Sequence, residues 1–182
     1  LGLTLVQVTH DPEEAFLMAD RMAILMEGRI EQTGRPADLY NRPANLRVAK
    51  FLMLQNLYPA RVGARTDGGY QTVQLDEAAI AFETLAAEEF PEGSRALVGI
   101  RPEEVILLRP DRAPDTARQK NLVLAVVESW ADLGHYRLVR LRVGRTLIDA
   151  WLNIRAAREY PMEAGMEVWF HVRPWSFCLL PP

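Results

Sequence analysis

Residues 3–19, LTLVQVTHDPEEAFLMA, join an apolar stretch to a helix start and decide the fold expected at this end of the chain. Residues 3–9 are short, apolar and rich in β-branched side chains, which predicts a buried strand of a parallel sheet. Asp11 then predicts a helix N-cap, followed by Pro12 in the first helical position and by Glu14 where a capping box places its acid. The stretch therefore predicts the strand-to-helix step of an α/β sheet.

His10 is the candidate functional residue of this junction, because it ends the predicted strand and precedes the helix cap. Ligands of parallel α/β sheets bind beyond the carboxyl ends of the strands. An imidazole placed there can donate a hydrogen bond to an anionic oxygen or orient a water molecule. The alternative interpretation gives His10 a structural role, bonded to a neighbouring loop. We interpret Asp11 and Glu14 as cap residues, not as catalytic acids.

The hydrophobic pattern changes near Asn56. Before it, we expect strands at 22–26 and 30–33 and short helices at 34–40 and after Asn45. After it, many short period-two segments predict a barrel or sandwich, and the polar residues 109–120 predict a loop between its two halves. The expected strands are 58–65, 70–75, 78–82, 95–100, 105–108, 122–130, 136–143, 146–151, 167–172 and 177–180.

Composition excludes several classes of protein. The 182 residues suit one or two domains, and a single cysteine, Cys178, excludes an intramolecular disulfide framework. The formal net charge of −3 gives no electrostatic argument for nucleic acid. The opening residues lack a signal peptide, and the apolar runs are too short to span a membrane. Since the first residue is Leu1, we expect a piece of a longer protein.

Residues 3–56 resemble, in unbroken order, the end of the nucleotide-binding domain of ABC importers. Within them, residues 8–52 read VTHDPEEAFLMADRMAILMEGRIEQTGRPADLYNRPANLRVAKFL. The second half resembles the accessory TOBE domain of the maltose, polyamine, sulfate and ferric-iron importer ATPases. The matching segments are GIRPE at 99–103, VVE at 126–128, LG at 133–134 and GMEV at 165–168. The resemblance implies an α/β edge fragment of an ABC ATPase domain, residues 1–56, followed by an all-β OB-like regulatory barrel, residues 57–182.

By this resemblance His10 is the switch histidine, which contacts the ATP γ-phosphate and helps to hold the attacking water in the full-length dimer. The resemblance implies ATP and Mg²⁺ as cofactors, a second copy and a membrane permease as partners, and indirectly a substrate-binding protein. It places the subunit in the cytoplasm, at the inner face of the membrane. The barrel would serve dimerisation and regulation, and we expect residues 3–27 to pack against a second copy or the barrel.

The motifs that bind and hydrolyse ATP are missing from this sequence. It contains no G-x-x-x-x-G-K-[ST] loop, no LSGGQ-type signature and no apolar run ending in Asp-Glu. We expect them upstream of Leu1, and we expect this chain alone to be inactive and to hold no cofactor or metal.

Two other functions compete with the ATPase interpretation. The barrel could act as a stand-alone small-molecule or oxyanion sensor, with residues 1–56 as a dimerising arm. A nucleic-acid-binding barrel is the weaker alternative, because residues 57–182 are slightly acidic. The arginines Arg137, Arg140, Arg142 and Arg145 predict a solvated face or a contact with an acidic partner.

Overall fold

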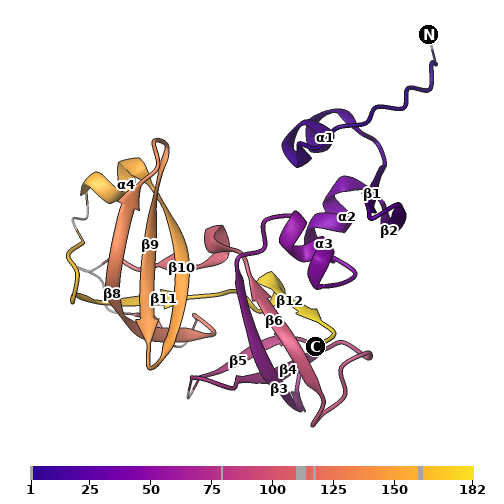
Figure 1. The fold of residues 1–182 in the computed structure, drawn as a ribbon. Helices are drawn as coiled ribbons and strands as arrows, with labels where there is room; N and C mark the ends of the chain where they lie inside the picture. The colour runs from indigo at the N-terminus through magenta and orange to yellow at the C-terminus, as the bar shows by residue number, and fades with distance from the viewer. Residues whose placement is uncertain (1, 79, 110–113, 117, 160–161) are drawn as a thin grey trace. The chain divides into compact units, whose positions relative to one another are not determined.

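The computed structural model describes residues 2–78, 80–109, 114–116, 118–159 and 162–182 (Figure 1). The chain divides into two compact units, Leu1–Met53 and Leu54–Pro182. None of the helices in these described ranges is long and apolar enough to cross a membrane.

The first unit is a β-hairpin packed with three short helices. Its elements are α1 (Pro12–Met18), β1 (Met22–Met26), β2 (Arg29–Gly34), α2 (Pro36–Asn41) and α3 (Leu46–Phe51). Glu27 and Gly28 have φ values of 51° and 75°, which suit the tight turn between β1 and β2. A small core contains Ile24, Leu39, Val48 and Leu52. The hairpin and all three helices lie where the sequence predicts them.

The strand predicted for residues 3–9 is wrong. Residues 2–9 adopt no regular structure, and Leu3 and Val8 are 84% and 94% exposed. A strand needs a hydrogen-bonded neighbour. In the described part of the unit, β1 and β2 pair only with each other, so residues 3–9 have no neighbouring strand.

The second unit consists of two five-stranded antiparallel sheets (Figure 1). The order in the first is β12-β6-β3-β4-β5, and the order in the second is β10-β9-β8-β11-β7. The strands are β3 (Asn56–Thr66), β4 (Tyr70–Leu75), β5 (Ala81–Leu85), β6 (Arg95–Ile100), β7 (Ile106–Leu107), β8 (Leu122–Asp132), β9 (Tyr136–Val143), β10 (Thr146–Asn153), β11 (Glu167–His171) and β12 (Phe177–Leu180). A helix α4 (Ile154–Glu159) and the 3₁₀ turns η1 (Pro102–Glu104) and η2 (Pro174–Ser176) connect them.

Each sheet takes one strand from the other half of the sequence. Strand β7 follows β6 but pairs with β11, while β12 follows β11 but pairs with β6. We call β3, β4, β5, β6 and β12 the first half-barrel, and β7 to β11 the second half-barrel. Phe82 on β5 and Phe177 on β12, the edge strands of the first sheet, approach with ring centroids 5.1 Å apart, so this sheet is curled.

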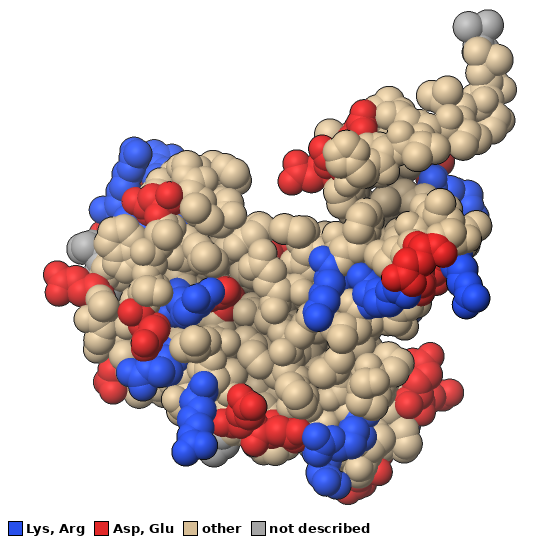
Figure 2. Space-filling view, viewed as in Figure 1, with Lys and Arg blue, Asp and Glu red and all other residues tan. Residues whose placement is uncertain are grey.

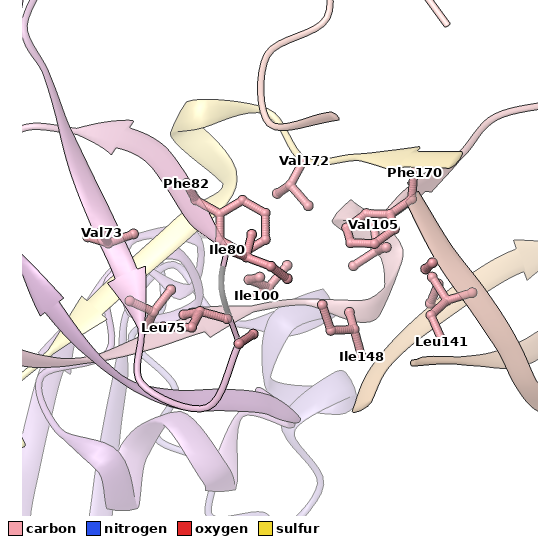
Figure 3. Close-up of a cluster of buried hydrophobic side chains, with 14 of the residues drawn as sticks. Val73, Leu75, Ile80, Phe82, Ile100, Val105, Leu141, Ile148, Phe170 and Val172 are labelled. Atoms are coloured by element: carbon pink, nitrogen blue, oxygen red, sulfur yellow. The ribbon is translucent and has the colours of Figure 1, made fainter. Parts of the chain in front are cut away.

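One continuous core fills both half-barrels (Figure 3). The close-up shows side chains of both halves meeting, with Phe82 and Ile100 from the first and Ile148 and Phe170 from the second. All four are fully buried. The alternation of buried and exposed residues that predicts the strands therefore gives each sheet one core-facing side.

The two half-barrels follow one repeated plan, which the sequence analysis did not detect. Asn56-Leu57 begins β3, and Asn121-Leu122 stands at the start of β8, with Asn121 one residue before the strand. Arg101-Pro102 opens η1, and Arg173-Pro174 opens η2. Strand order also corresponds, because β5-β4-β3-β6-β12 matches β10-β9-β8-β11-β7 element for element.

Three smaller features of the structure differ from the predictions or lie partly outside the described residues. The strand predicted at 78–82 lies at Ala81–Leu85, and residue 79 is outside the described residues. Helix α4 was not expected. In the loop predicted at 109–120, residues 110–113 and 117 also lie outside the described residues.

Candidate functional site

His10 lies at the bend that precedes α1, and its side chain is exposed. Asp11 caps the helix, because its Oδ1 accepts hydrogen bonds from the backbone N of Glu13 at 2.9 Å and of Glu14 at 3.4 Å. The expected capping box does not form. The Asp11 backbone N donates instead to Thr9 Oγ1 at 3.1 Å. The cap fixes where the helix begins and leaves the imidazole open to the outside.

The described residues form no metal site with His10. They contain no group of three or more His, Cys, Asp or Glu side chains that could hold a metal ion. An exposed imidazole can donate to a ligand that approaches from outside. His10 could therefore contribute one hydrogen bond to an anionic ligand held elsewhere.

A cluster of polar groups linked by hydrogen bonds lies where the two half-barrels meet. The Asn56 side chain pairs with the backbone of Asp149 on β10: Asn56 Nδ2 donates to the carbonyl oxygen, and Asn56 Oδ1 accepts from the amide, both at 2.8 Å. Tyr58 Oη donates to the carbonyl oxygen of Leu147 at 2.6 Å. Burial raises the pKa of Tyr58, and Asp149 raises it further. Tyr58 therefore stays a neutral donor.

Asn121 forms the equivalent contact from the other side. Its Oδ1 accepts from the backbone N of Glu83 on β5 at 2.6 Å, and its Nδ2 donates to the Glu83 carbonyl oxygen at 2.8 Å. Strands β5 and β10 are the edges of their sheets, and open edges present unpaired backbone groups. We call Asn56 and Asn121 the asparagine latches, because each covers the edge strand of the opposite half-barrel.

The 3₁₀ turns complete this reciprocal arrangement. Turn η1 packs against β10, and η2 packs against β5. Ser176 Oγ donates to Glu104 Oε2, and these residues occupy equivalent positions, three residues after Arg173 and Arg101. The GIRPE segment thus contributes to the junction between the half-barrels.

Three of the four clustered arginines are neutralised by carboxylates within the unit. Arg140 binds Asp149 through two hydrogen bonds of 2.7 and 2.9 Å. Arg137 is 8% exposed, binds Asp132 at 2.6 and 3.0 Å, and lies 4.0 Å from the Trp130 ring centroid. Arg142 binds Glu128 at 2.7 Å. On the face in Figure 2, Lys and Arg side chains alternate with Asp and Glu side chains.

Replacing Asn56 with Ala should destabilise the second unit by about 2–4 kcal/mol, because two part-buried backbone groups of Asp149 lose their partner. The free energy of unfolding in urea, followed by tryptophan fluorescence, measures the loss. The control is Gln55→Ala, which truncates the exposed neighbouring side chain. If both variants unfold at the wild-type midpoint, the latch does not stabilise the junction.

The second unit should lose stability as the pH falls below about 6.5. Burial of His171 lowers its pKa from 6.5, and Arg173 lowers it further. The folded state therefore binds fewer protons than the unfolded state, so protonation favours unfolding. His171→Gln should make the urea midpoint less dependent on pH between 5 and 7.5. An unchanged slope would contradict this role of His171.

Comparisons with known proteins give several relatives. The Fe(3+) ions import ATP-binding protein FbpC 2 of Rhizobium meliloti (strain 1021) is 32% identical over 176 residues, covering 92% of this chain and 42% of that protein. A spermidine/putrescine import ATP-binding protein PotA, of Oleidesulfovibrio alaskensis, is 40% identical over 115 residues, covering 63% of this chain and 30% of that protein. The sulfate/thiosulfate import ATP-binding protein CysA 2 of Chromobacterium violaceum is 40% identical over 144 residues, covering 78% of this chain and 35% of that protein. The chain spans less than half the length of these relatives. No protein-family model matches it.

A solved structure shares the fold. The cytoplasmic molybdate-binding protein ModG, with molybdate bound, matches with a TM-score of 0.62 at 15% identity, covering 70% of this chain and 96% of that one. At this identity the likeness concerns the fold alone. The curled sheets and this match confirm the predicted OB-like barrel and the mainly β architecture.

Proposed function

Since the chain is related in sequence to the C-terminal region of ABC importer ATP-binding subunits, we propose that it forms that region of an ATP-hydrolysing importer subunit. In such a subunit, ATP binding and hydrolysis are coupled to solute uptake through a membrane permease. Residues 1–56 act as the tail of the ATPase domain, and residues 57–182 act as the TOBE-type regulatory barrel.

His10 is the residue of this chain that acts on ATP. Its exposed imidazole, held at the start of α1 by the Asp11 cap, donates a hydrogen bond to the γ-phosphate in the assembled dimer. ATP and Mg²⁺ are cofactors of the complete subunit. This sequence contains no phosphate loop, so the chain alone hydrolyses no ATP.

The partners follow from the same assignment. They are a second copy of the subunit and the permease, with a substrate-binding protein acting through the permease. The subunit works in the cytoplasm, against the inner face of the cell membrane. The barrel contributes to dimerisation and regulation.

The observation that carries this proposal is the 32% identity with FbpC 2 across 92% of the chain. The matched part of the chain is longer than either compact unit alone. The similarity therefore extends over both the helical unit and the barrel. A relationship limited to the barrel would support a binding module equally well.

The test is a chimera in which this chain replaces the matching segment of the Rhizobium meliloti FbpC 2 protein. We expect the purified chimera to hydrolyse ATP in the presence of Mg²⁺. The unaltered relative is the positive control, and the present chain alone is the negative control. A folded chimera without ATP hydrolysis, together with saturable binding of molybdate or sulfate by the present chain, would instead favour the oxyanion sensor.

A further inference from the structure

Strand register sets which interior residues correspond in the two half-barrels. Val62 pairs with Val73 in the first, and Val127 pairs with Leu141 in the second. Both valines lie six residues after a latch asparagine. Gln71 lies two residues before Val73 on β4, and Val139 lies two residues before Leu141 on β9. Gln71 therefore corresponds to Val139.

The interiors differ in polarity at this end. Thr84 pairs with Gln71, and Ala150 pairs with Val139. The backbone N of Val62 donates to the carbonyl oxygen of Ser94 at 2.9 Å. In the same way, the backbone N of Val127 donates to the carbonyl oxygen of Met166 at 2.8 Å. We call Gln71, Thr84 and Ser94 the polar end of the first half-barrel. The corresponding residues of the second are Val139, Ala150 and Met166, all apolar.

The polar end contains two buried groups with unused hydrogen-bonding capacity. Gln71 is 1% exposed and lies on the same face of β4 as the core residues Val73 and Leu75. Gln71 Nε2 and Ser94 Oγ are buried, and neither has a hydrogen-bond partner among the residues that the structure describes. Buried polar groups of this kind are commonly paired with ordered water.

We propose that the polar end of the first half-barrel binds an ordered water molecule, which accepts a hydrogen bond from Gln71 Nε2 and bonds to Ser94 Oγ. The backbone N of Val62 bonds to Ser94, and Val62 pairs with Val73 on β4, two residues from Gln71. Because Gln71 and Thr84 are 1% and 2% exposed, water suits the site better than a larger ligand. The equivalent positions of the second half-barrel, Val139, Ala150 and Met166, carry only apolar side chains, so no water is needed at that place.

The first test is solution NMR of the intact chain. We expect nuclear Overhauser effects between a long-lived water and the side-chain amide protons of Gln71. Gln71→Leu should abolish the signal from this water while the spectrum stays folded. The proposal would be overturned if the side-chain amide protons of Gln71 showed no nuclear Overhauser effect to water. It would also be overturned if the bound molecule were larger than water.

The second test is a double-mutant cycle in urea unfolding. If one water joins the two side chains, Gln71→Val combined with Ser94→Ala should shift the midpoint by less than the sum of the single shifts. The control pair is Gln74→Val with Ser94→Ala, because Gln74 Nε2 already donates to the Ala78 carbonyl oxygen at 3.0 Å. That pair should be additive. Additive shifts for Gln71 and Ser94 would contradict a shared water.

Discussion

His10→Ala should lower the rate of ATP hydrolysis by about 10²–10³-fold in the chimera, because removing one donor to a developing oxyanion typically has an effect of this size. The substitution removes an exposed side chain, so the fold should remain intact. Steady-state ATP hydrolysis at saturating Mg²⁺-ATP measures the effect on kcat. Circular dichroism and the urea midpoint of the chimera should stay unchanged.

The matched control is His135→Ala, which removes an exposed histidine between β8 and β9 in the second unit. This variant should hydrolyse ATP at the rate of the unaltered chimera. If His10→Ala keeps its activity within twofold, His10 does not contact the reacting phosphate. The structural interpretation of His10 would then be the better one.

Deleting residues 177–182 should abolish the cooperative unfolding transition of the second unit. The deletion removes β12, which pairs with β6 and closes the first half-barrel. Leu180 is fully buried, and Phe177 and Leu179 pack against the core. Burial of these three side chains contributes at most about 5–9 kcal/mol, the value for full burial, which is comparable to the whole stability of about 5–15 kcal/mol of a typical domain.

Tryptophan fluorescence during urea unfolding measures this loss, because all four tryptophans lie in the second unit. The control is deletion of Pro181 and Pro182 alone, which are exposed and follow β12. This shorter deletion should change the free energy of unfolding by less than ~0.5 kcal/mol. A wild-type transition after the longer deletion would show that β12 is dispensable.

Local signals in the sequence predicted most of the strands. The segments 70–75, 95–100, 136–143 and 177–180 have the bounds that the structure shows. Period-two alternation and glycine turns act over a few residues, so they can be read directly from the sequence. The cap at Asn45 is local too, since Asn45 Oδ1 accepts from the Val48 backbone N at 3.0 Å.

The errors arose where distant partners decide the local structure. Ala78 and Ile80 are apolar and buried, which imitates a strand. They belong instead to the turn after β4, because the backbone N of Leu75 donates to the Ile80 carbonyl oxygen at 3.1 Å. Residues 3–9 show the opposite case, since a strand-like sequence without a neighbouring strand forms no strand.

The candidate site was predicted only in part. The position of His10 before a helix cap follows from the sequence, but its proposed ligand depends on residues that this chain does not contain. The asparagine latches were missed because Asn56 and Asp149 are far apart in sequence. Comparison of the Asn-Leu pairs at the start of β3 and β8 and of the Arg-Pro pairs at the start of η1 and η2 could have revealed the repeat.

The exchange of β7 and β12 has a consequence for biosynthesis. The ribosome completes β6 long before β12, because Phe177 follows its partner Ile100 by 77 residues. At about 5–20 residues per second, this delay lasts roughly 4–15 s. During that time the nascent first half-barrel exposes the edge of β6 and the apolar surface that β12 later covers. We therefore expect the two half-barrels to complete their folding together only after β12 has left the exit tunnel, because until then the nascent chain exposes apolar surface and an unpaired strand edge.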